Sequence, residues 1–99
     1  MTEVTFAVAR DVAWVDAEAA GGTGAHVFLA KLPDGPPRVL SGPAWAIWMA
    51  LAETAGSVDQ IVTVTSELTG QDPEGIRSDI ESFLARLLTE GLAVRSGRP

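Results

Sequence analysis

A proline-rich turn and a very short apolar segment stand directly before the most apolar helical run, in "LPDGPPRVLSGPAWAIWMAL" from Leu32 to Leu51. Proline has no backbone N–H group, so Pro36 and Pro37 cannot donate a hydrogen bond to a neighbouring strand. A strand that begins beside them belongs at the edge of a sheet. We therefore predict that Arg38–Leu40 forms a short edge strand.

The partner of this edge strand lies just before the turn. Ala25–Leu32 reads "AHVFLAKL" and is the clearest strand of the chain. The "PDGPP" turn suits a hairpin, because proline presets its own φ angle and glycine accepts a positive one. Val4–Ala9 and Val12–Val15 are further short strand candidates, and a glycine-rich loop over residues 17–24 separates them from the hairpin. These strands predict a small antiparallel sheet.

Three helical runs follow, each bounded by residues typical of helix ends. The predicted helices are Ala44–Glu53 with Ser41 as its N-cap and Pro43 near its first position, the run after the N-cap Ser57, and Pro73–Glu90 after the N-cap Asp72. Apolar residues in the third run follow the three-to-four spacing of an amphipathic helix. The "LAVR" segment after Gly91 is a candidate for a last short strand.

This order of elements predicts an α+β fold. We expect a winged helix-turn-helix-like arrangement, with a small N-terminal antiparallel β-sheet followed by three α-helices. The length suits a single domain over residues 1–99. We expect residues 1–11 to be a loosely ordered start and residues 95–99 to be a frayed tail.

Composition argues against several classes of function. The chain has one histidine, no cysteine and no tyrosine, and it shows no phosphate-binding or metal-binding motif. We predict no catalytic residue, no metal and no cofactor. The net charge of −6 repels nucleic acids, and the third helical run carries more acidic than basic residues. No signal peptide and no apolar run of membrane-spanning length is apparent, so we expect a cytoplasmic protein without membrane contacts.

Three ordered motifs resemble the PqqD-like family, also called RiPP recognition elements. They are "VLSGPAWAIWMAL", "SVDQIV" and "TGQDPEGIRSDIESFLARLLTEGLA", and the resemblance covers about Val12 to Val94. It implies a non-catalytic winged-helix-like domain that binds the leader segment of a ribosomally made precursor peptide. The leader would add as a strand to the sheet edge, pack against the third helix and be presented to a modifying enzyme.

An open strand edge beside an apolar helix is physically suited to such strand addition. We expect Arg38 to pair with an acidic leader residue, and Arg77, Asp79 and Glu81 to lie near the rim of the groove. The predicted peptide-binding residues are Arg38, Val39, Leu40, Ile76, Arg77, Ile80, Phe83, Leu84 and Leu87.

The expected partners are the leader peptide and a modifying enzyme such as a radical SAM protein, a cyclase or a peptidase. An open sheet edge also leaves a homodimer as an option. Two alternatives remain: a winged-helix DNA-binding regulator, and a docking subunit of a biosynthetic enzyme complex. The fold alone does not separate them.

Overall fold

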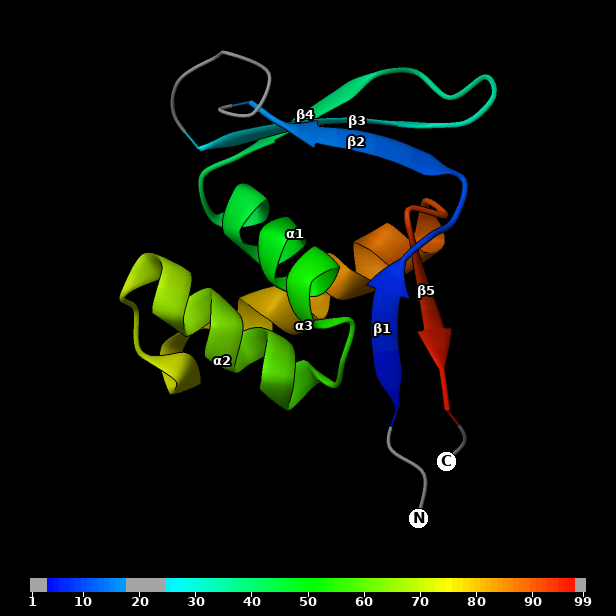
Figure 1. The fold of residues 1–99 in the computed structure, drawn as a ribbon. Coiled ribbons are helices and arrows are strands. Elements are labelled where there is room, and N and C mark those ends of the chain that lie inside the picture. Colours follow the sequence, from blue (N-terminus) through cyan, green and yellow to red (C-terminus); the bar gives the residue numbers. More distant parts are fainter. Residues whose placement is uncertain (1–3, 18–24, 98–99) are drawn as a thin grey trace.

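In the computed structural model, which describes residues 4–17 and 25–97, strands precede the three helices, as the sequence predicts. The elements are β1 (Thr5–Val8), β2 (Val12–Asp16), β3 (His26–Lys31), β4 (Arg38–Ser41), α1 (Pro43–Thr54), α2 (Val58–Thr69), α3 (Pro73–Thr89) and β5 (Ala93–Ser96). The predicted α+β class with a small antiparallel sheet and three helices is confirmed (Figure 1).

β3 is the central strand of an antiparallel three-stranded sheet with the order β2-β3-β4. Its side chains alternate between the two faces: Val27 and Leu29 are buried, whereas Phe28 between them is exposed. This is the pattern of a sheet with one face on a core and one face toward solvent. β4 pairs with β3 through Val27↔Leu40, so the predicted hairpin and its edge strand are confirmed.

The two ends of the described chain meet in a second, two-stranded sheet. β1 pairs antiparallel with β5, with Thr5 opposite Ser96 and Val8 opposite Ala93. We expected residues 1–11 to be loosely ordered and residues 95–99 to be frayed; residues 5–8 and 95–96 of these segments lie in paired strands. The last strand therefore fixes the first one, and residues 1–3 and 98–99 lie outside the described part.

The helix ends follow local chemistry with one correction. Ser57 caps α2 in a capping box: its side chain accepts from the Gln60 N–H, and the Gln60 side chain accepts from the Ser57 N–H. The prediction of Ser41 as the N-cap of α1 is wrong. Ser41 is the last residue of β4, and Gly42 takes the cap position with φ 60°. The sharp turn from strand to helix needs this left-handed conformation, which glycine adopts without strain.

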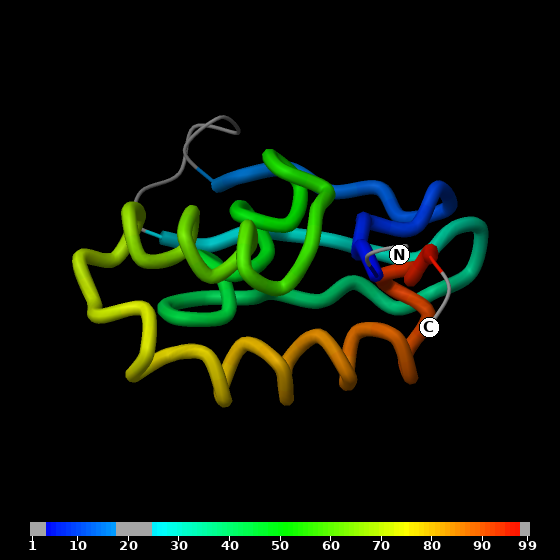
Figure 2. Tube along the Cα trace, turned by 90° about the horizontal axis from the view of Figure 1, so that it is seen from below, coloured from blue at the N-terminus to red at the C-terminus, as the bar shows by residue number. Residues whose placement is uncertain are grey.

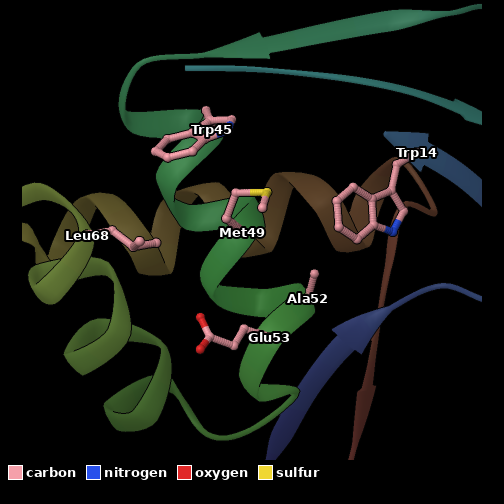
Figure 3. A pocket seen from close by; sticks show the side chains of 6 residues that line it. All are labelled: Trp14, Trp45, Met49, Ala52, Glu53 and Leu68. Atoms are coloured by element: carbon pink, nitrogen blue, oxygen red, sulfur yellow. The ribbon is translucent and has the colours of Figure 1, made fainter. Parts of the chain in front are cut away.

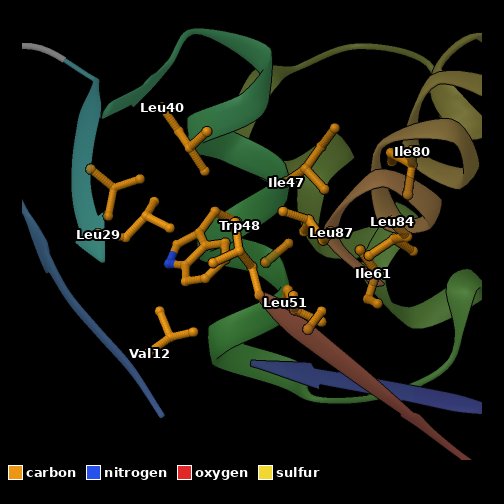
Figure 4. Packing of buried hydrophobic residues seen from close by; sticks show 14 of the residues in the cluster. Val12, Leu29, Leu40, Ile47, Trp48, Leu51, Ile61, Ile80, Leu84 and Leu87 are labelled. Atoms are coloured by element: carbon orange, nitrogen blue, oxygen red, sulfur yellow. The ribbon is translucent and has the colours of Figure 1, made fainter. Parts of the chain in front are cut away.

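The hydrophobic core lies between the β2-β3-β4 sheet and the helices, with α1 at its centre. Trp48 and Leu51 on α1 are completely buried, and Trp48 lies between the sheet residues and those of the other helices (Figure 4). Trp14 on β2 packs edge-on against Trp48, with ring centroids 6.1 Å apart. These contacts attach the sheet to α1, so the sheet edges keep fixed positions relative to the helices.

α3 runs beside one edge of the sheet and not beneath its middle. Seen along the direction of Figure 2, the order across the molecule is β2, β3, β4 and then α3. α3 packs on α2 and β5. In the described residues, no helix is both long and apolar enough to span a membrane.

Candidate functional site

The outer edge of β4 presents backbone groups that pair with no strand of the described residues. The Gly42 N–H donates to the Ala25 carbonyl across a distance of 3.3 Å. Backbone groups in an antiparallel strand point alternately to the two sides. Arg38 and Leu40 therefore direct their N–H and C=O groups toward β3, whereas Val39 and Ser41 direct theirs away from the sheet. Within the described residues, β3 is the one strand that pairs with β4.

A hollow of about 330 Å³ lies between the middle of α3 and the first turns of α1, which begins two residues after the end of β4. Its α1 wall has Pro43, Ala44 and Ile47, and its α3 wall has Asp79, Ser82, Phe83 and Arg86. A smaller hollow of about 160 Å³ shares Pro43, Ile47 and Asp79 and continues between the helices toward Ile76. Together they form an apolar trough with a charged rim.

An ion pair bridges β4 and α3 at one end of the trough. The Arg38 guanidinium binds the Glu90 carboxylate just after the end of α3. Both side chains are about one-third exposed, so solvent screens the pair and its contribution to stability is small. Arg38 thus already has a carboxylate partner within the chain. A leader carboxylate would have to displace Glu90 to use it.

The predicted site residues fall into two groups. Ile80, Leu84 and Leu87 are at most 2% exposed and belong to the core, together with Leu40 and Ile76. The apolar side chains at three-to-four spacing on α3 form one stripe along the helix, and that stripe faces the interior of the protein. Phe83 lies beside the stripe, is only partly buried and lines the trough.

Two predicted residues lie at the surface in different places. Val39 is 55% exposed on the outer face of the sheet, directly at the open edge. Arg77 points toward α2, where its Nη2 lies 2.7 Å from Oδ1 of Asp59. This hydrogen bond raises the pKa of Arg77. Of the three residues expected at the rim, Asp79 lines the trough.

Sequence reasoning missed the α1 wall. The sequence predicts Pro43 and Ala44 only as the start of a helix, and the predicted site residues include neither Ile47 nor Arg86. The available signal was the glycine-proline junction, because a helix that starts directly after an edge strand must leave its first turn close to that edge. In the described part of the chain, acidic and histidine side chains form no cluster of three or more that could hold a metal ion.

Comparisons with known proteins give a related fold and a family. A solved structure, TbiB1 in complex with the TbiA(beta) leader peptide, is similar with a TM-score of 0.67 and 21% sequence identity, over 88% of this chain and 93% of that chain. That similarity shows a shared fold. No curated protein matches the chain.

The family model of coenzyme PQQ synthesis protein D (PqqD) matches residues 36–93. The matched region is more than half of the chain and includes β4, the three helices and the start of β5. It therefore contains both walls of the trough and the open strand edge. The chain belongs to the PqqD family.

Proposed function

We propose that this protein is a non-catalytic module that captures the leader segment of a ribosomally synthesised precursor peptide and presents it to a modifying enzyme. The leader adds to β4 as a further strand and lies over the trough. The observation that carries the proposal is the pair of outward-facing residues Val39 and Ser41 beside an apolar hollow. Addition of a strand to an exposed edge is a recurring mode of peptide recognition.

The backbone contribution is limited by the length of the edge. Val39 and Ser41 each offer one N–H and one C=O, so an added strand gains about four main-chain hydrogen bonds. At about 0.5–1.5 kcal/mol each, these bonds supply a net of about 2–6 kcal/mol. Micromolar affinity requires about 8 kcal/mol. Side chains of the leader must therefore supply the rest, and every second one faces the trough.

The contact residues follow from this placement. Val39 borders the added strand on the outer face, while Phe83 and Ile47 receive an apolar leader side chain in the trough. Arg86 and Asp79 on the rim select charged leader residues of opposite sign. From the predicted set, Leu40, Leu84 and Leu87 support the walls from behind, and Ile76 and Ile80 line the deeper part of the trough.

Family membership and the shared fold support the proposal. The solved protein with the same fold was captured with a leader peptide, and the elements that form the trough here lie within the PqqD match. Neither comparison supports the alternative of a DNA-binding regulator. Ribosomal synthesis of the precursor places the interaction in the cytoplasm, and the modifying enzyme would be a radical SAM protein, a cyclase or a peptidase.

Backbone N-methylation of the leader tests strand addition without altering the protein. A search of the genes that neighbour this protein's gene for a short precursor supplies the leader peptide for the test. N-methyl groups on alternate residues block either the N–H groups that face β4 or those that face solvent. We expect one alternate set to weaken binding at least tenfold in isothermal titration calorimetry and the other to leave it unchanged. Equal effects of both sets, or no binding of the unmodified leader, would overturn the proposal.

A further inference from the structure

A second hollow of about 330 Å³ lies among β2, α1 and α2 and shares no lining residue with the trough. Its lining residues are Trp14, Trp45, Met49, Ala52, Glu53 and Leu68. Trp45, Met49 and Glu53 follow one another at four-residue intervals along one face of α1. Trp14 borders the hollow from β2 and Leu68 borders it from α2 (Figure 3). This hollow is therefore a surface feature separate from the proposed leader site.

The walls of this hollow are apolar and hold one charged group. The Trp45 Nε1 already donates to Oδ1 of Asp16 at 2.8 Å, so the indole offers its ring to a ligand and not its N–H. Trp14 and Leu68 are 36% and 43% exposed. Glu53 is exposed and forms no ion pair with any described residue. Such a recess suits a ligand that is apolar along its length and positively charged at its end.

The elements around the hollow carry negative charge and no positive charge. The sequence has no lysine or arginine from residue 11 to 30 or from residue 39 to 76, and these segments include all of β2, α1 and α2. The acidic residues of the three elements are Asp16, Glu53, Asp59 and Glu67. Of these, Asp59 is paired with Arg77 of α3. The remaining carboxylates attract a cationic partner to this side of the protein.

We propose that this hollow receives an arginine side chain from a basic segment of a partner protein. The methylene stem of the arginine lies along the apolar wall at Met49, and its guanidinium binds the Glu53 carboxylate. Arginine suits the site better than lysine because a planar guanidinium can stack on an indole ring while its N–H groups bind a carboxylate.

Charge complementarity decides between this occupant and the others. A purely apolar side chain would remove water from the Glu53 carboxylate without giving it a partner, which costs free energy. A nucleic acid would bring phosphates to elements that carry no lysine or arginine. A second copy of this chain would bring another net charge of −6. A basic protein segment satisfies both the carboxylate and the aromatic walls.

The partner is the modifying enzyme, and this step alone rests on the proposed function. Because the hollow and the trough have no residue in common, one molecule can hold the leader and the enzyme at the same time. The arginine site itself does not depend on the leader. Its test can therefore fail while strand addition at β4 holds, and the reverse is equally possible.

A pair of short peptides tests the chemistry of the site. The probe is acetyl-Leu-Arg-Leu-amide, and its control has citrulline, a neutral analogue of nearly the same shape, in place of arginine. Binding to the full chain is followed by NMR. The indole N–H signals of Trp14 and Trp45 and the methyl signal of Met49 report on the hollow, whereas the methyl signals of Ile47 report on the trough. We expect the arginine probe to shift the hollow signals and the citrulline peptide to bind at least fivefold more weakly.

A matched pair of variants locates the positive end of the probe. Glu53→Gln removes the carboxylate of the hollow and should weaken binding of the arginine probe at least threefold, without changing its leader affinity. Glu81→Gln removes an exposed carboxylate from α3 and should leave the probe affinity unchanged. Added salt should weaken binding of the arginine probe, because it screens the pair with Glu53. Circular dichroism shows whether each variant keeps the fold.

Three results would overturn the proposal. They are equal affinities of the arginine and citrulline peptides, an arginine probe that leaves the Trp14, Trp45 and Met49 signals unmoved, and a folded Glu53→Gln protein that binds the probe as tightly as the wild type. Equal affinities would identify the hollow as a site for an apolar partner. Leader binding is measured separately by calorimetry, so none of these results bears on the proposed function.

Discussion

Replacement of Phe83 by alanine should weaken leader binding about tenfold in a protein that still folds. Phe83 is the α3 side chain that is partly buried in the core and also lines the trough. If the leader covers about 50 Å² of its remaining apolar surface, the loss at about 25 cal/mol per Å² is about 1.3 kcal/mol. That value corresponds to a dissociation constant about ten times larger.

Leu88→Ala is the matched control. Leu88 lies on the same helix and is also partly buried against the core, but it does not line the trough. Leader affinity is measured by fluorescence anisotropy with a labelled leader peptide, and stability by urea unfolding. We expect the Phe83 variant to lose affinity and the Leu88 variant to retain it, although both lose stability because both side chains pack against the core. Unchanged affinity in a folded Phe83→Ala protein would refute the assignment of the α3 wall.

Three further predictions concern the scaffold. Asp16→Ala removes the acceptor of the Trp45 indole N–H and should lower the free energy of unfolding by about 1–2 kcal/mol. Asp34→Ala in the exposed turn is the control. Equal urea midpoints for the two variants would contradict a stabilising role of this hydrogen bond between β2 and α1. Ser57→Ala removes the capping box of α2 and should lower stability by about 1 kcal/mol, whereas Ser78→Ala on the exposed face of α3 should change it little. The hydrogen bond from Lys31 holds the pKa of Asp11 below its usual value, so the pair stabilises the fold above the unfolded-state pKa of Asp11 and ceases to do so as the pH falls through the lower folded-state pKa. The free energies of unfolding of wild type and Asp11→Asn should therefore differ at neutral pH and converge in acid. A difference that persists in acid would exclude the ion pair as its cause.

Local chemistry made the strand edge and most helix ends predictable. Pro36 and Pro37 lack the N–H groups that a central strand needs, and the structure places the strand after them at the sheet edge. Ser57 and Gln60 have the spacing of a capping box, which depends on only four consecutive residues. Such features need no information from distant parts of the chain.

Features that depend on distant contacts were harder to predict. The pairing of β1 with β5 joins residues more than eighty positions apart, and neither strand alone indicates its partner. On α3, Phe83, Leu84 and Leu87 are all apolar, and the spacing does not tell which of them reaches the trough. That division depends on the position of α1, because Ile47 and Pro43 form the other wall.

Amide hydrogen exchange at β4, followed by NMR with and without saturating leader peptide, tests the central claim most directly. The Val39 and Ser41 amides face away from β3, whereas the Arg38 and Leu40 amides face it and serve as internal references. We predict that the leader slows exchange at Val39 and Ser41 at least tenfold and changes Arg38 and Leu40 little. A saturated complex in which the Val39 and Ser41 amides exchange as fast as in the free protein would contradict strand addition at this edge.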